Sequence, residues 1–154
     1  MIETETAAEL ESHVGESIGA SDWVRIEQEN VDRFADLTGD RNWIHVDVER
    51  ARKEMPDGRT IAHGLYVLSL GPSLKDQVYR VRRRARGLNY GYDRVRFVRP
   101  VQTGDWIRLV LTVAAVTPHR RGTRIDMVHD FEARESGAVA ISAHNILLIE
   151  TPDA

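Results

Sequence analysis

Regular alternation of apolar and polar residues through the C-terminal half is the feature that most restricts the possible folds. In "TRIDMVHDFEAR" (123–134), apolar side chains occupy nearly every second position and charged side chains lie between them. A two-residue period is that of a strand with one face in water. The segments "DWIRLVLTVAAVT" (105–117) and "AVAISAHNILLIE" (138–150) are long strands too, the last apolar on both faces. Turn signals at "TGD", "RRG" and "ESG" separate the strands, so the pattern predicts an antiparallel meander.

A fourth strand precedes the meander and changes phase partway along. In "LNYGYDRVRFVRPV" (88–101), the apolar positions are even up to residue 92 and odd at residues 95 and 97. A β-bulge produces such a shift, because it inserts one extra residue into one strand of a pair. We therefore predict a bulge near Asp93 or Arg94, and a bend of the sheet there.

A buried helix is expected before these strands. The segment "TIAHGLYVLSLGPSLKDQVYRV" (60–81) is apolar almost all round in its first half and carries an apolar stripe in its second. Pro72 should break the helix near Leu70. The segment "SDWVRIEQEN", from Ser21, begins like one more strand. One central helix wrapped by a curved antiparallel sheet is the hot-dog arrangement, an α+β fold.

Composition limits the organisation and the function classes. The 154 residues contain no repeat or linker, which predicts a single domain over 1–154 with an ordered core of about 20–150. A net charge of −3 argues against wholesale nucleic-acid binding and against a polybasic membrane anchor. The chain has no cysteine, no signal-peptide pattern and no long apolar run, so we expect a cytoplasmic protein. Pairing of sheet edges favours a homodimer.

Two polar residues follow a predicted helix end. The segment "QENVDRFADLTG" (28–39) has helical spacing and stops at a glycine. Asp47 can cap a second short helix, "VERARKEM". Asp40 and His45 should therefore lie on a loop between two helices, where reactive groups are often found.

The stretch "FADLTGDRNWIHVDVERA" (34–51), with "TIAHGLYVLSL" after it, resembles the MaoC-like family of (R)-specific enoyl-CoA hydratases and dehydratases. The match includes Phe34, Gly39, Asp40, Asn42, His45 and Ala51. Trp43 stands where the family usually has proline, and could either close one side of the acyl pocket or pack beneath the loop and support it. "LNYGYDRVRFVRPVQTGD" also resembles a branch related to nodulation protein N, so the resemblance covers about residues 20–150.

The resemblance implies reversible hydration of a trans-2-enoyl-CoA, or of an acyl carrier protein thioester, to the (R)-3-hydroxyacyl product, without a cofactor. Asp40 and His45 would act jointly on one water. Two proton-transferring groups suit the chemistry, because hydration removes one proton from water and delivers another to the α-carbon. Gly64 would present its backbone N–H to the thioester oxygen, with Ser69 and Asn42 near the substrate.

Several alternatives stay open. Asp40 and His45 could be turn and capping residues only. A hot-dog acyl-CoA thioesterase would release free coenzyme A, and a binding protein would perform no chemistry. His63 is left outside the catalytic pair as a packing or capping residue. No helical histidine spacing suggests a metal, so none is predicted.

The remaining histidines and arginines have plainer interpretations. His129 and His144 lie on predicted strands and are interpreted as hydrogen-bonded core or interface residues. The basic run "YRVRRRARG" (79–87) is a solvated surface or a contact for the phosphates of coenzyme A. RNA binding is disfavoured by the overall negative charge.

Overall fold

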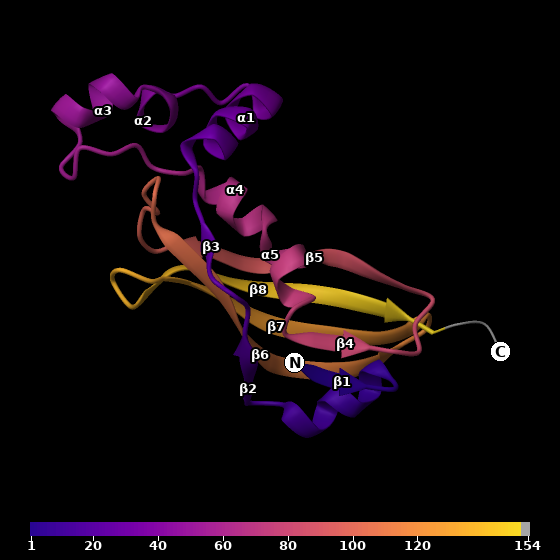
Figure 1. The fold of residues 1–154 in the computed structure, drawn as a ribbon. Coiled ribbons are helices and arrows are strands. Elements are labelled where there is room, and N and C mark those ends of the chain that lie inside the picture. Colours follow the sequence, from indigo (N-terminus) through magenta and orange to yellow (C-terminus); the bar gives the residue numbers. More distant parts are fainter. Residues whose placement is uncertain (152–154) are drawn as a thin grey trace.

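Four long antiparallel strands form the frame of the molecule. The computed structural model describes residues 1–151, in which the main sheet has the order β2-β6-β7-β8-β5 (Figure 1). Consecutive strands pair from β6 through β8, and β5 pairs with the free side of β8. The long strands are β5 (Arg86–Phe97), β6 (Trp106–His119), β7 (Gly122–Ala133) and β8 (Ala138–Glu150). The predicted meander is confirmed.

Strand β5 contains the predicted bulge. Its pairing with β8 shifts between Tyr92 and Arg94, which leaves Asp93 as the extra residue, and shifts again between Asn89 and Gly91. Most side chains of β5 are at least partly exposed, because this strand forms one edge of the sheet. The bulge therefore bends the edge that has no neighbour within the described chain.

The central helix is split in two. Helix α4 (Gly64–Ser69) and helix α5 (Gly71–Lys75) meet at Leu70, and Pro72 lies in the first turn of α5. The predicted break is thus confirmed, but the expected continuation to residue 81 is wrong. Residues 79–81 form strand β4 (Tyr79–Val81), in which Tyr79 and Val81 are buried and Arg80 is exposed.

The N-terminal residues are more ordered than the sequence suggested. Strand β1 (Ile2–Thr4) pairs in parallel with β4, and strand β2 (Ser17–Ala20) pairs with β6. A 3-10 helix, η1 (Ala7–His13), lies between them and buries Leu10 completely. The ordered part therefore begins before residue 20, because β1 and η1 have partners far along the chain that no local pattern indicates.

The core lies between the helix pair and the sheet. Val67 of α4 and Leu74 of α5 join buried side chains of the long strands, among them Leu109, Ile125 and Phe131. Each such apolar side chain contributes about 1.5–3 kcal/mol when it is removed from water. This packing fixes the N-terminal end of α4 above the sheet.

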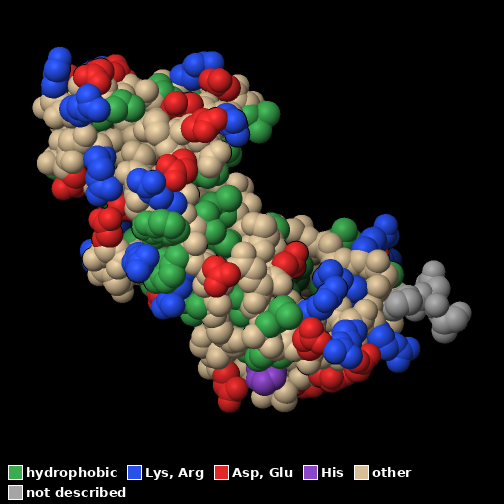
Figure 2. Space-filling view, viewed as in Figure 1, with side chains coloured by type: hydrophobic (Ala, Val, Ile, Leu, Met, Phe, Trp, Pro, Cys, Tyr) green, Lys and Arg blue, Asp and Glu red, His purple; other side chains and the backbone are tan. Residues whose placement is uncertain are grey.

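A helical lobe projects beyond one end of the sheet (Figure 1). It contains α1 (Gln28–Thr38), α2 (Trp43–Val46) and α3 (Val48–Glu54), and β3 (Val24–Arg25) connects it to the sheet edge. The predicted strand from Ser21 is thus only two residues long. The space-filling view shows a concave outline between the lobe and the body of the molecule (Figure 2). The longest helix of the described residues, α1, has 11 residues, and none combines the length and hydropathy needed to cross a membrane.

Candidate active site

Asp40 is held at the end of helix α1. Gly39 adopts the left-handed conformation, with φ of 79°, and its N–H donates to the carbonyl of Ala35. A glycine takes this conformation without steric cost, so the chain turns sharply and Asp40 follows outside the helix. The Asp40 side chain is 60% exposed, so its carboxylate is open to solvent and to a ligand.

His45 lies on the one-turn helix α2 rather than on the predicted open loop. Its side chain is buried, and its Nδ1 is 2.7 Å from the carbonyl oxygen of Ile61. Because a carbonyl oxygen can only accept, Nδ1 carries the hydrogen in this contact. In the neutral ring, Nε2 then has a free lone pair, which is the form that can take a proton from water.

His63 is part of the same cluster. Its Nε2 is 2.9 Å from the carbonyl oxygen of Asp40 and therefore donates to it. Its ring stacks on the ring of His45, with centroids 3.8 Å apart and an interplanar angle of 27°. From the sequence, His63 is expected only to pack or to cap the helix, because no spacing between residues 45 and 63 indicates that their rings meet.

The cluster has the dimensions of a water-binding site. A carboxylate oxygen of Asp40 and one ring nitrogen each of His45 and His63 all lie within 4.8 Å of one another. Two hydrogen bonds of about 2.8 Å that meet at a tetrahedral oxygen separate their outer atoms by roughly 4.6 Å. One water can therefore contact the carboxylate and an imidazole together.

The same three groups are also possible ligands of a metal ion. Zinc would need the histidine nitrogens at about 2.0–2.1 Å and directed at one point. One nitrogen of each ring already donates to a backbone carbonyl, which leaves Nε2 of His45 and Nδ1 of His63 as the ring nitrogens that could bind a metal. The absence of a metal stays a prediction.

An apolar cavity of about 470 Å³ opens beside the cluster. Its lining includes Asp40, His45 and His63, with Gly64, Phe97 and further residues from α1, α4, β8 and the segment that follows β5. A Cβ placed on Gly64 would lie 2.5 Å from Cε1 of Phe97, so any side chain there would displace the aromatic ring. The backbone N–H of Gly64 belongs to the first residue of α4, which has no acceptor within the helix.

Two other predicted site residues have contacts outside this cavity. Asn42 caps helix α2, where its side-chain oxygen accepts from the N–H of Ile44 at 3.3 Å. Ser69 is exposed, and its hydroxyl donates to the carbonyl of Tyr66 at 2.6 Å. Neither side chain lines the cavity. The structure therefore brings Asp40, His45 and Gly64 together, but not Ser69 or Asn42.

Trp43, the first residue of α2, is half-buried. The guanidinium carbon of Arg50, near the start of α3, is 4.0 Å from the centre of the Trp43 ring. The ring is absent from the cavity lining, which disfavours the interpretation of Trp43 as a pocket wall. The contact with Arg50 instead favours a role in holding α2 against α3.

His129 and His144 match the expectation only in part. His129 is buried, as predicted, but neither ring nitrogen has a hydrogen-bond partner among residues 1–151. His144 is exposed opposite Arg94, so its assignment to the core is wrong: on β8 it faces away from the helices. Its possible place in an interface between protomers stays a prediction.

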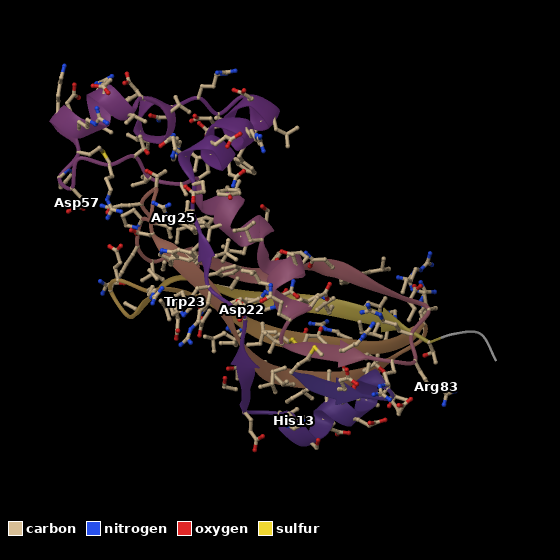
Figure 3. The ribbon with its side chains drawn as sticks, viewed as in Figure 1. His13, Asp22, Trp23, Arg25, Asp57 and Arg83 are labelled. Atoms are coloured by element: carbon tan, nitrogen blue, oxygen red, sulfur yellow. The ribbon has the colours of Figure 1, made fainter. Side chains whose placement is uncertain are left out.

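The arginine run lies at the end of the sheet opposite the helical lobe, where Arg83 is labelled in Figure 3. Arg82 forms ion pairs with Glu3 and Glu5, and Arg86 forms one with Glu150. Part of the run is therefore structural.

Comparison with known proteins gives a consistent result. Residues 9–134 match the family described as MaoC like domain. The chain is 46% identical over 119 residues to 3-hydroxyacyl-thioester dehydratase Z of Mycobacterium tuberculosis, covering 77% of this chain and 78% of that protein. It is 45% identical over 102 residues to nodulation protein N of Rhizobium leguminosarum, covering 66% of this chain and 63% of that protein. An unliganded R-hydratase from Pseudomonas aeruginosa has the same fold, with a TM-score of 0.74, 23% identity, and coverage of 90% of this chain and 83% of that one.

Proposed function

Because this chain belongs to the MaoC-like domain family, we propose that it is a 3-hydroxyacyl-thioester dehydratase that interconverts a trans-2-enoyl thioester and its (R)-3-hydroxyacyl form. The observation that carries the proposal is the position of Asp40 and His45 at one cavity. The Nδ1 of His45 donates to the carbonyl of Ile61, so its other ring nitrogen, Nε2, is proposed to carry the proton transfer.

Asp40 and His45 each have a role in the hydration step. A water held between the Asp40 carboxylate and Nε2 of His45 attacks the β-carbon of the enoyl thioester. The pair takes one proton from this water and delivers a proton to the α-carbon, so that the elements of water add across the double bond. Each such proton-transferring group contributes roughly 10² to 10⁴ in rate. The two act as a unit, and we assign acid and base to them jointly.

Negative charge develops on the thioester oxygen during this addition. The N–H of Gly64 is proposed to donate to that oxygen, because it lies at the cavity and has no acceptor within α4. Helix α4 has only six residues, so the donor itself, rather than a long helix dipole, is the stabilising group. The lack of a side chain at Gly64 lets the thioester approach the backbone.

His63 is proposed to position the pair without touching the substrate. It holds the backbone carbonyl of Asp40 and covers one face of the His45 ring. Since Asp40 has an exposed side chain on a turn, this contact restricts the loop that carries the carboxylate. Misplacement of a reacting group by about 1 Å can cost 10²-fold in rate.

The functional form is proposed to be a cytoplasmic homodimer. Strand β5 offers 12 residues of backbone at the sheet edge, together with exposed aromatic side chains at Tyr90 and Phe97. Pairing of two such edges across a two-fold axis would cover them. Sedimentation analysis should give twice the 17.5 kDa mass of one chain. A monomer at micromolar concentration would contradict this part of the proposal.

Hydration can be tested directly with crotonyl-CoA and longer enoyl-CoAs. The proposal predicts loss of the enoyl-thioester absorbance and formation of the (R)-3-hydroxyacyl product on chiral analysis. A thiol reagent in the same assay detects free coenzyme A, which a thioesterase would release and a hydratase would not. Acyl carrier protein thioesters of the same chains then establish the carrier preference.

A further inference from the structure

A second cavity, of about 430 Å³, lies between helix α5 and strands β5, β7 and β8. It shares no lining residue with the active-site cavity. His129 lies at its floor and is 1% exposed, and neither of its ring nitrogens has a hydrogen-bond partner among residues 1–151. A leucine would fill this position without leaving polar atoms unpaired, so packing alone does not account for a histidine.

The floor offers both a donor and acceptors. Burial, with a smaller effect of Lys75, lowers the pKa of His129 to about 4, so the ring is neutral near pH 7 and has one N–H and one lone pair. Asn145, which is 2% exposed, donates through its amide nitrogen to Oδ1 of Asn89 and to the carbonyl of Gly91. Its own amide oxygen remains available as an acceptor.

Positive charge predominates at the mouth of this cavity. Lys75, Arg84 and Arg86 line it, against the single carboxylate of Asp76. Lys75 pairs with Asp76 at 2.5 Å, and Arg86 pairs with Glu150. Within residues 1–151, Arg84 has no ion-pair partner. A ligand with a negative charge would therefore meet an unmatched guanidinium at the entrance.

We propose that this second cavity binds a small organic acid, with its carboxylate at Arg84 and Lys75 and a hydroxyl or carbonyl group against His129 and Asn145. Leu147 and Ile149, which also line the cavity, would contact the carbon chain between these two ends. The mixture of a cationic mouth, an apolar wall and a buried neutral imidazole matches a molecule that is charged at one end and uncharged but polar at the other.

Such a carboxylate could come from two sources. It could belong to a free acid, or it could be the far end of an acyl chain whose thioester is at the active site, in which case the inference also rests on the proposed function. Ile141 of the first cavity and Asn145 of the second are four residues apart on β8, roughly 13 Å. A medium-length acyl chain has a comparable length.

Binding of 5-hydroxypentanoate, followed by calorimetry and by NMR of the His129 ring, tests the inference without any activity assay. We expect a dissociation constant on the order of 1 mM, and weaker binding of pentanoate and of 5-hydroxypentanamide. Arg84→Gln, at an exposed position, and His129→Leu should each weaken binding about tenfold, the range of one charge-assisted or buried hydrogen bond. Arg99→Gln, which removes an exposed arginine of the first cavity, is the matched control and should bind normally.

Absence of binding, or equal binding by all three variants and the wild type, would overturn the inference, as would loss of binding in Arg99→Gln alone. A melting temperature for each variant separates lost binding from lost folding, and Arg84→Gln keeps the test valid if His129→Leu fails to fold.

Hydration of enoyl-CoAs that end in a carboxylate or in a methyl group distinguishes the two sources of the carboxylate. If Arg84→Gln slows the hydration of carboxylate-ended chains only, the acid is part of the substrate. If it slows the hydration of neither kind of chain, the acid is a separate molecule. An enzyme inactive on every chain would reject the proposed function and leave the binding result standing.

Discussion

The imidazole rings of His45 and His63 stack face to face, with centroids 3.8 Å apart. The two residues come from different helical segments, since His45 belongs to α2 and His63 directly precedes α4. The stack therefore joins the helical lobe to the helix that lies on the sheet. Each ring also contacts a backbone carbonyl of the other segment, His45 that of Ile61 and His63 that of Asp40.

Replacement of His63 should separate positioning from chemistry. His63→Phe keeps a ring against His45 but removes the donor to Asp40, whereas His63→Ala removes both. We expect kcat to fall about tenfold for phenylalanine and by roughly 10² for alanine, with KM changed little, because the reacting groups are displaced while the cavity remains. A loss of activity that simply parallels a lower melting temperature would indicate a structural residue only.

Gly64→Ala should lower turnover through its contact with Phe97. The added methyl group would overlap the Phe97 ring and crowd the backbone N–H. Alanine is the better helix former, so α4 itself should persist. Steady-state kinetics on Gly64→Ala and on Gly64→Ala combined with Phe97→Ala check this. If Phe97→Ala restores stability but not turnover, restricted access to the backbone N–H of residue 64 is the cause of the lower turnover. Full activity of Gly64→Ala alone would remove Gly64 from the proposed site.

Trp43→Ala should affect all acyl chain lengths equally. The ring packs against Arg50 and does not line the cavity, so its loss loosens α2, which carries His45. We expect a lower melting temperature and a uniform fall in kcat/KM across a series of enoyl-CoAs. Arg50→Ala is the matched control, because it removes the other partner of the contact. A shift of preference toward longer chains, with unchanged stability, would instead assign Trp43 to the pocket.

The free energy of unfolding should depend on pH through His129. Burial lowers its pKa in the folded state to about 4, below the value of about 6.5 for an unfolded chain. Between these values the unfolded state binds the proton, so stability is complete above pH 6.5 and decreases as the pH falls toward 4. The expected loss is about 3 kcal/mol. Urea unfolding at several pH values should show this slope in the wild type and a smaller slope in His129→Leu; equal slopes would contradict the assignment.

The fold was predictable from sequence wherever the local periodicity of apolar residues determines the secondary structure. The alternation in β6 and β7 and the phase change around Asp93 both correspond to the observed strands. The prediction of helix over residues 79–81 is wrong because Val78 and Val81 continue the helical spacing, whereas Tyr79 and Val81 also have the two-residue spacing of a short strand that buries both. The parallel pairing of β1 with β4 depends on residues about 77 positions apart, which no local pattern records.

The candidate site was predictable only in part, for a related reason. Gly39 and Asp47 indicated the helix ends that flank Asp40 and His45, and both ends are where they were expected. The contact of His63 with both residues depends on how α4 meets the lobe, which is a tertiary relationship. Ser69 shows the converse: it shares a short helix with Gly64, yet its hydroxyl donates to Tyr66, outside the cavity.

Asp40 and His45 are proposed to divide the proton transfers of hydration between them. The most direct measurement is the rate of crotonyl-CoA hydration by Asp40→Asn, His45→Gln and the double variant, with circular dichroism as the control for folding. Both substitutions keep the size of the side chain and remove proton transfer. We expect each single variant to lose roughly 10² to 10⁴ in kcat, and the double variant to be little worse than the poorer single one. Near-normal turnover by either folded variant, or losses that multiply in the double variant, would contradict it.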